Sequence, residues 1–258
     1  MAVASLCSVY FRYMQPLAAR GCSAEQIQIW ADVLAQAVTG ELIGALNYTT
    51  LAELYQEPSE KREALEHAQG ERGHAASFTA AGKTLGIDVM VNLEAQYWRR
   101  IRSSFLSRAK AGDLVGCILA QEVMLESFAV ASYGQVAEAA PGELGSTFAR
   151  IAEEEGEHVD HAIKMLRAER ARDPHRFDTT VHETHEEIMT TLAQMISPKN
   201  QDCGCSLCAG SCVKSSLSQV GVRLSDIRGA SLHRYLRSLD EIGVPGESSL
   251  IWVAQLPV

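Results

Sequence analysis

Apolar residues recur every three to four positions through most of the chain, which is the period of an α-helix with one buried face. The first long apolar stripe runs from Ile27 to Ala52 and predicts a helix over residues 24–56. Ser23 is a plausible N-cap for this helix, with Gln26 three residues on, as in a capping box. No segment alternates apolar and polar residues for long enough to predict a strand. The pattern therefore predicts an all-α protein.

Proline, glycine and capping residues divide the rest of the chain into further helices. The segment 113–139 is rich in Leu, Val, Ile, Met and Phe, so we expect it near the centre of the fold. Gly243-Val244-Pro245 is expected to stop the last helix. The further predicted helices are residues 60–85, 89–110, 113–139, 143–171, 177–196 and 224–241.

Two short carboxylate–histidine pairs lie on these predicted helices. They are Glu71-Arg-Gly-His74 and Glu155-Gly-Glu-His158. Side chains three residues apart share one face of a helix, so each pair can present an oxygen and a nitrogen ligand together. One such pair arises often by chance on a charged helix, but two of them on separate helices are a strong signal of a metal centre.

Two single glutamates complete the pattern. Glu41 precedes Leu42 and Ile43, and Glu126 lies between Leu125 and Phe128. A charged side chain is rarely buried among apolar neighbours unless it is paired. One glutamate from each of two helices plus Glu-x-x-His from two others is the ligand set of carboxylate-bridged di-iron and di-manganese bundles. We therefore predict a ferritin-like four-helix bundle with a di-metal centre.

The predicted ligands suit iron that activates O2, because anionic oxygen ligands stabilise the oxidised metal and imidazole completes the set. Four buried carboxylates without cations would be forced to take up protons, and two divalent ions cancel their charge. Ligand type alone does not separate iron from manganese. In this interpretation Glu71 and Glu155 bridge the two metals, Glu41 and His74 bind one metal, and Glu126 and His158 bind the other.

Nearby titratable residues have weaker signals. His67 and His161 are expected to be surface histidines, with support of the metal ligands as the alternative. Glu154 is expected to lie on a solvated face, from which it could hydrogen-bond a ligating histidine. His182 and His185 lie in a charged helix and are expected to be exposed.

Length and charge bound the remaining possibilities. The 258 residues suggest an N-terminal segment 1–23, the di-metal bundle 24–172, and a helical C-terminal extension 173–258 with a Cys-rich loop. The net charge of −9 argues against a nucleic-acid or anionic-membrane partner. No uninterrupted apolar run approaches membrane-spanning length, and residues 1–20 lack the basic start of a signal peptide. We therefore expect a cytoplasmic protein.

Four of the seven cysteines are crowded into ten residues, and the other three are scattered. In a cytosolic chain such a cluster indicates metal or redox chemistry more than structural disulfides. Zinc bound by four thiolates, an iron–sulfur cluster, and reactive or paired thiols without metal remain alternatives. The clustered residues are Cys203, Cys205, Cys208 and Cys212.

The segments that carry the six predicted ligands resemble the cyanobacterial aldehyde-deformylating oxygenases. The resemblance covers roughly residues 24–170 and keeps the order and approximate spacing of the ligands. The matching motifs are Gly40-Glu41…Asn47-Tyr48, Glu71-Arg-Gly-His74…Phe78-Thr-Ala-Ala-Gly82, Gln121…Glu126-Ser-Phe-Ala…Tyr133 and Glu155-Gly-Glu-His158.

This resemblance implies a di-iron enzyme that uses O2 and a ferredoxin-type electron donor. Its substrate would be a long-chain fatty aldehyde held in an apolar channel, and its products an alkane or alkene one carbon shorter plus formate. The resemblance also implies that Tyr48, Gln121 and Tyr133 are hydrogen-bonding groups near the metals and that Phe78 lines the channel.

The chain departs from the family pattern at several positions. Ala81 stands where the family commonly has a cysteine, and the Cys-rich loop has no counterpart in the family pattern. Glu122 stands where a neutral residue is expected, and it could be an extra ligand, an acid that supports the ligands, or an exposed residue. Alternative functions are a ferritin-like di-iron oxygenase of a specialised pathway with another substrate, a ferroxidase or iron-storage protein, and a metal-free bundle.

Overall fold

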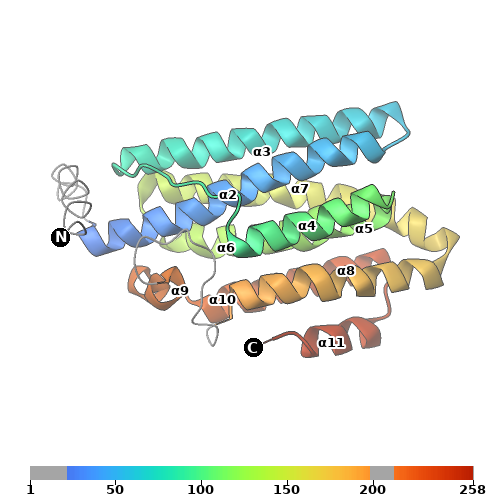
Figure 1. Cartoon of the computed structure of the whole chain (residues 1–258). Helices are drawn as coiled ribbons and strands as arrows, with labels where there is room; N and C mark the ends of the chain where they lie inside the picture. Colours follow the sequence, from blue (N-terminus) through green and yellow to red (C-terminus); the bar gives the residue numbers. More distant parts are fainter. Residues whose placement is uncertain (1–21, 198–211, 258) are drawn as a thin grey trace, which may run out of the picture.

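The computed structural model describes residues 22–197 and 212–257, and within these ranges the chain forms helices and no strand (Figure 1). The all-α prediction is confirmed. In chain order the elements are α2 (Ala24–Leu54), α3 (Pro58–Thr84), α4 (Gln96–Lys110), α5 (Leu114–Ile118), the π-helical segment η3 (Leu119–Leu125), α6 (Glu126–Ala139), α7 (Gly142–Arg172), α8 (Pro174–Met195), α9 (Val213–Ser216), η4 (Leu217–Val220), α10 (Leu224–Ile242) and α11 (Gly246–Ala254).

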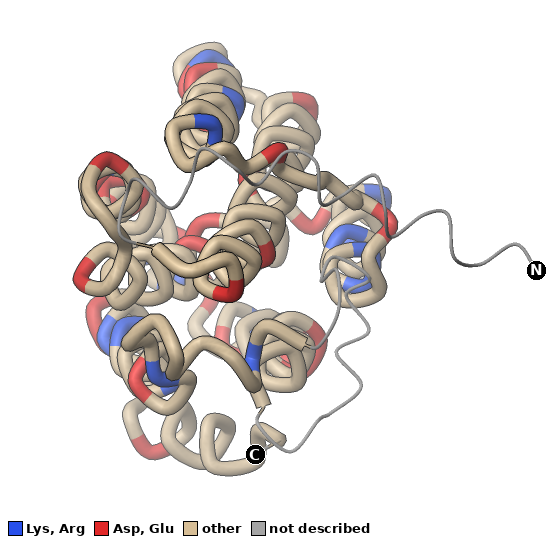
Figure 2. Tube along the Cα trace, turned by 90° about the vertical axis from the view of Figure 1, so that its left-hand side faces the viewer, with Lys and Arg blue, Asp and Glu red and all other residues tan. Residues whose placement is uncertain are grey.

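Four long rods form the bundle that carries the predicted ligands. Helix α2 packs along α3, α6 packs along α7, and α3 also contacts α7. Helices α4 and α8 pack against each other beside the bundle, and α10 packs against α6 and α7. Figure 1 shows the long helices side by side, and Figure 2 views them almost end-on. The capping box predicted at the start of α2 is present, because the Ser23 hydroxyl accepts from Gln26 N and the Gln26 side chain accepts from Ser23 N.

The third predicted helix begins later than expected, at Gln96 instead of residue 89. The preceding residues 87–95 form a connection that is attached to α2. Its Ile87 is buried, and the backbone N–H of Asn92 donates to Oγ1 of Thr39. Tertiary contacts therefore decide the start of this helix, where periodicity alone predicts a longer one.

The central segment 113–139 is interrupted by the π-helical segment η3, which the sequence did not predict. A π-helical turn pairs residues five apart and often occurs at functional sites. Gln121 and Glu126 are five apart, and Nε2 of Gln121 donates to Oε1 of Glu126 at 2.7 Å. Glu122, four residues before Glu126, faces a different neighbour. The widened turn thus brings Gln121, rather than Glu122, to the ligand.

The C-terminal helices share the core of the bundle. Val181 and Ile188 of α8 and Tyr235 of α10 are fully buried and belong to the same apolar cluster as Phe105 and Ile118. The helix α11 after Pro245 was not predicted, and its Trp252 packs against this cluster. The extension is therefore continuous with the bundle in its packing.

The prediction that His185 is exposed was wrong, because only 3% of the residue is accessible. Its Nε2 donates to the carbonyl of Trp252 at 3.2 Å, and its Nδ1 accepts from the Tyr235 hydroxyl at 3.0 Å. Burial lowers the pKa of His185 to about 4, so the ring is neutral at physiological pH. His185 lies on the same helix face as Val181 and Ile188, four residues before and three residues after it, and the neighbouring charges concealed this stripe.

Two of the described helical spans, Ala24–Leu54 and Leu114–Ala139, are long and apolar enough to cross a membrane by length and composition alone. This qualifies the expectation that no such stretch exists. In both spans, 67% of the most apolar stretch is buried inside the protein. Both spans also carry glutamates that face the bundle interior. Packing in the protein core accounts for the apolar character of the two helices.

Candidate metal centre

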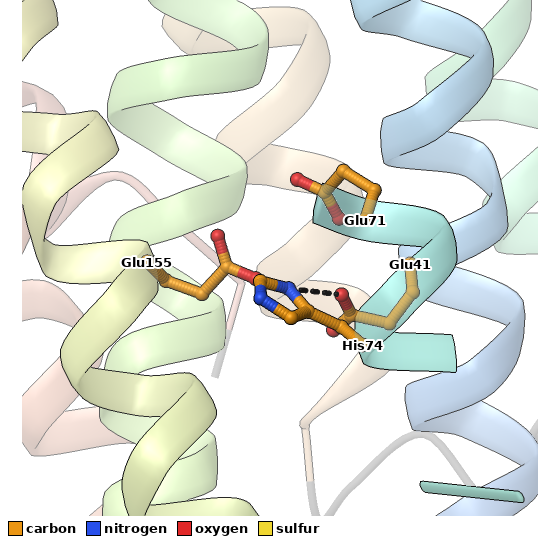
Figure 3. Close-up of side chains that lie close together, drawn as sticks. All are labelled: Glu41, Glu71, His74 and Glu155. Atoms are coloured by element: carbon orange, nitrogen blue, oxygen red, sulfur yellow. Dashed lines mark hydrogen bonds and ion pairs between the residues drawn. The ribbon is translucent and has the colours of Figure 1, made fainter. Parts of the chain in front are cut away.

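All six predicted ligands converge in the middle of the bundle from four helical rods. Figure 3 shows Glu41 of α2, Glu71 and His74 of α3 and Glu155 of α7 turned toward one another. The four glutamates and His74 are buried, with at most 4% of each residue accessible, and the His158 side chain is 12% accessible. These residues form two groups, and in each group one ligand atom from every residue lies within 4.8 Å of those from the others. The groups are Glu41, Glu71, His74 and Glu155, and Glu71, Glu126, Glu155 and His158.

Glu155 lies between the two histidines. Nδ1 of His74 is 2.8 Å from Oε1 of Glu155 and 3.1 Å from Oε2 of Glu41. Nδ1 of His158 is 2.9 Å from Oε2 of Glu155 and 4.0 Å from Oε1 of Glu71. Glu71 and Glu155 belong to both ligand groups. These are the two residues that the sequence predicted as bridges between the metals.

The carboxylates perturb one another strongly. Burial, followed by the charge of Glu155, raises the pKa of Glu41, Glu71 and Glu126. Burial also disfavours the Glu155 anion, but hydrogen bonds from His158 and His74 prevail and lower its pKa to about 2. For His74, hydrogen bonds to Glu155 and Glu41 outweigh burial and raise the pKa to about 11. The two histidines therefore stabilise the charge of Glu155, but the cluster contains too little positive charge to stabilise the other three carboxylates as anions.

Two divalent cations fit this donor set. Oε1 of Glu71 is buried and makes no hydrogen bond. Unsatisfied buried polar atoms are costly, and coordination to a metal would satisfy them. Gly44 leaves space for the Glu71 carboxylate because it has no side chain. A Cβ at this position would lie only 2.8 Å from Oε2 of Glu71. Carboxylate and imidazole ligands suit iron and manganese alike.

Hydrogen bonds orient the two terminal carboxylates. The Tyr48 hydroxyl donates to Oε1 of Glu126 at 3.2 Å, alongside the Gln121 amide, and the Tyr133 hydroxyl donates to Oε1 of Glu41. These three residues therefore lie where the resemblance implied.

The chain of donors behind Glu126 was not predicted from the sequence. Nδ2 of Asn47 donates to Oε1 of Gln121 at 2.6 Å. Nη1 of Arg102 donates in turn to Oδ1 of Asn47 at 2.6 Å. Each amide is thereby fixed in one orientation, with its N–H group toward Glu126. Arg102 is distant in sequence from both partners, so only the fold reveals this connection.

Glu154 orients His74, as the sequence allowed. Nε2 of His74 is 2.8 Å from Oε2 of Glu154, while Nδ1 faces the ligand cluster. Nη1 of Arg150 donates to both oxygens of Glu154, at 2.7 and 2.9 Å. A carboxylate on the second ring nitrogen fixes the tautomer of a metal-binding histidine.

His67 is not the surface residue that the sequence favoured. Its ring centroid lies 4.2 Å from that of His158 and 5.1 Å from that of Tyr48. Burial, followed by the charge of His158, lowers the pKa of His67 to about 3. His67 therefore packs as a neutral ring against a metal-facing histidine. The spacing of four residues between His67 and Glu71 was the only signal of this position in the sequence.

Glu122 is 2% accessible, which excludes the exposed alternative. It does not belong to either di-metal ligand group, and its Oε2 lies 3.7 Å from Nδ1 of His161. His161 itself is partly buried, between Glu122 and glutamates of α3.

An apolar cavity of about 150 Å³ adjoins the carboxylates on one side. Phe78, which the resemblance placed in the channel wall, packs behind that wall, with its ring centroid 5.2 Å from Tyr133 and 4.5 Å from Phe148. At the metal-facing end the lining includes Glu41, Glu71, Gln121, Glu126 and Tyr133, and elsewhere it includes Val33, Ala37, Ala129, Val136, Phe148, Ile196, Val213, Leu217 and Ile227.

The C-terminal extension supplies part of the cavity wall. Ile196, Val213 and Leu217 come from the segments on either side of the Cys-rich loop, and Lys214 brings a cationic group to the lining. Cys212 also lines the cavity, and it forms no disulfide with another cysteine in the described part of the chain. The zinc prediction for the cluster rests mainly on Cys203, Cys205 and Cys208, which lie outside the described residues.

Comparison with known proteins agrees with the fold and shows the family. A protein from Synechococcus, described as having aldehyde deformylating oxidase activity, superposes with a TM-score of 0.75. The match covers 90% of this chain and 98% of the other at 18% sequence identity, and it supports the ferritin-like fold. The family model for long-chain fatty aldehyde decarbonylase matches residues 24–203, a range that includes all six predicted ligands. The chain therefore belongs to the long-chain fatty aldehyde decarbonylase family.

Proposed function

We propose that the protein is a di-iron enzyme that uses O2 and external electrons to convert a fatty aldehyde into an alkane one carbon shorter plus formate. Balancing the reaction requires four electrons and three protons for each O2, with one water formed. The electrons must come from outside the chain, and we propose a ferredoxin-type donor. Bound iron would supply O2 activation and polarisation of the aldehyde carbonyl.

One observation carries this proposal: the apolar cavity ends on the metal-facing carboxylates Glu41, Glu71 and Glu126. An alkyl chain among Val33, Val136 and other apolar side chains would direct its aldehyde group toward these carboxylates. The apolar wall would also exclude water from the reacting carbon. Family membership supports the aldehyde as the substrate class.

Polar side chains at the metal-facing end of the cavity can position the aldehyde group. Tyr133 and Gln121 line the cavity and hydrogen-bond Glu41 and Glu126, so their orientations are fixed before a substrate arrives. Fixed donors of this kind lower the cost of orienting a reactant. An iron-storage function would not need an apolar cavity with a wall supplied by the C-terminal extension.

The test is a product assay on protein loaded anaerobically with Fe(II). Medium- to long-chain aldehydes, a ferredoxin reducing system and O2 are added, and hydrocarbon and formate are measured by mass spectrometry. We expect equimolar formate and an alkane one carbon shorter than the aldehyde. Glu126→Ala should abolish both products, whereas Glu157→Ala, an exposed change on α7, should not.

Other outcomes separate the alternatives. O2 consumption without hydrocarbon would refute aldehyde cleavage and favour an oxygenase with a different substrate. Iron oxidation in a very large assembly, without product from any aldehyde, would favour storage. Equal activity of Glu126→Ala and wild type would refute the assigned metal centre.

A further inference from the structure

A second cluster of metal-binding side chains lies beside the di-metal centre. Glu60 and Glu63 lie three residues apart on α3, and His161 lies three residues after His158 on α7. Nε2 of His161 is 3.4 Å from Oε1 of Glu63 and 3.7 Å from Oε2 of Glu60. One ligand atom from each of these three residues lies within 4.8 Å of the other two.

These separations fit a shared metal ion better than direct hydrogen bonds. A nitrogen–oxygen hydrogen bond is about 2.7–3.2 Å long. Two ligand atoms that each lie about 2.1 Å from one metal are roughly 3.0 Å apart at an angle of about 90° and roughly 3.6 Å apart at about 120°. Oε2 of Glu60 is buried and makes no hydrogen bond. The three side chains thus surround a point at which a cation would satisfy them.

Glu122 provides an independent observation. Its carboxylate is 2% accessible, and its Oε2 makes no hydrogen bond. This oxygen lies 3.7 Å from Nδ1 of His161, on the side of the ring opposite the nitrogen that faces Glu60 and Glu63. A carboxylate on the second ring nitrogen is the usual support of a metal-binding histidine. With Nε2 on a metal, Nδ1–H would donate to Glu122.

The surrounding charge favours a cation. Among the described residues, the ion pairs of Glu60, Glu63 and Glu122 are all with His161, and no lysine or arginine neutralises the three carboxylates. The side chains of Glu60, Glu63 and His161 are 29%, 41% and 25% accessible, so an ion can reach them from solvent.

We propose that Glu60, Glu63 and His161 bind one divalent transition-metal ion, with Glu122 orienting the imidazole. The site shares no ligand with the di-metal centre, and none of its residues lines the apolar cavity. His67 lies between the two sites, with its ring centroid 4.2 Å from that of His158 and 6.0 Å from that of His161. One imidazole and two carboxylates suit Mn²⁺, Fe²⁺, Co²⁺ or Zn²⁺.

The experiment counts manganese. The full-length protein is saturated with Mn²⁺, separated from unbound metal and measured by mass spectrometry, and electron paramagnetic resonance distinguishes an isolated Mn²⁺ from a coupled pair. We expect three ions per chain and an isolated-ion signal in wild type. His161→Ala and Glu63→Gln should each retain two ions and lose that signal. The control Glu66→Gln removes an exposed charge from the same helix and should retain three.

Two ions in wild type, or three ions in His161→Ala or Glu63→Gln, would overturn the proposal. If His161→Ala disturbs folding, Glu63→Gln decides, because it changes a partly exposed side chain without altering its size. Glu122→Gln should keep the third ion at saturation but weaken its binding about 10–100-fold, as loss of a supporting carboxylate does. Unchanged affinity in Glu122→Gln would contradict the orienting role.

Discussion

Gly44 on α2 makes room for the bridging position of Glu71, so Gly44→Ala should weaken metal binding without unfolding the bundle. The new Cβ would lie 2.8 Å from Oε2 and 2.9 Å from Cδ of Glu71, whereas ordinary contact begins at 3.4 Å. The carboxylate must therefore retreat by roughly 0.6 Å, which exceeds the tolerance of about 0.2 Å for metal–ligand distances. We expect metal affinity to fall about 10–100-fold, or about 1.4–2.7 kcal/mol for the ion or ions that Glu71 binds.

Gly73→Ala is the matched control, because it lies in the Glu71-Arg-Gly-His74 motif and its Cβ would meet nothing within 4 Å. Replacing a helical glycine by alanine stabilises a helix by up to about 1 kcal/mol. Gly73→Ala should therefore be at least as stable as wild type and bind metal equally well. Competition with a chelator measures affinity, and thermal unfolding of the metal-free proteins measures stability. Wild-type affinity in Gly44→Ala would refute the argument that Gly44 accommodates the carboxylate.

Three further changes test other parts of the structure. Tyr133→Phe removes the hydrogen bond to Glu41 and should weaken metal binding about 10–100-fold in the chelator assay. Ala129→Phe narrows the cavity and should shift the aldehyde preference in the product assay to shorter chains at unchanged metal content, whereas an unchanged preference would contradict the assigned cavity. The pKa of His185 is about 4 when folded and 6.5 ordinarily, so the unfolded chain alone takes up this proton as pH falls from 6.5 to 4. This equilibrium alone should lower the unfolding free energy of wild type by on the order of 3 kcal/mol over this range, so His185→Phe should lose correspondingly less than wild type.

The convergence of the six predicted ligands could be foreseen because it depends on spacing within helices. A Glu-x-x-His pair such as Glu71 and His74 lies on one helix face whatever the tertiary structure is. Glu41 and Glu126 could be found because charges among apolar residues require partners. The helix ends at Ser23 and Pro58 follow capping and proline rules that are equally local.

Features that depend on contacts between distant segments could not be predicted from the sequence. The late start of α4 results from the hydrogen bond between Asn92 and Thr39, and the burial of His185 from its contacts with Tyr235 and Trp252. No simple sequence rule identifies a π-helical turn. The sequence therefore could not predict that Gln121 points toward Glu126 while Glu122 points toward His161.

The most direct test of the metal centre is a crystal structure of iron-loaded protein with anomalous diffraction measured at the iron absorption edge. We expect two iron peaks about 3.5–4 Å apart in the centre of the bundle. Glu71 and Glu155 should contact both ions, His74 should contact one, and His158 the other. A single peak at these six side chains, or no iron there, would contradict the di-metal centre on which the proposed function depends.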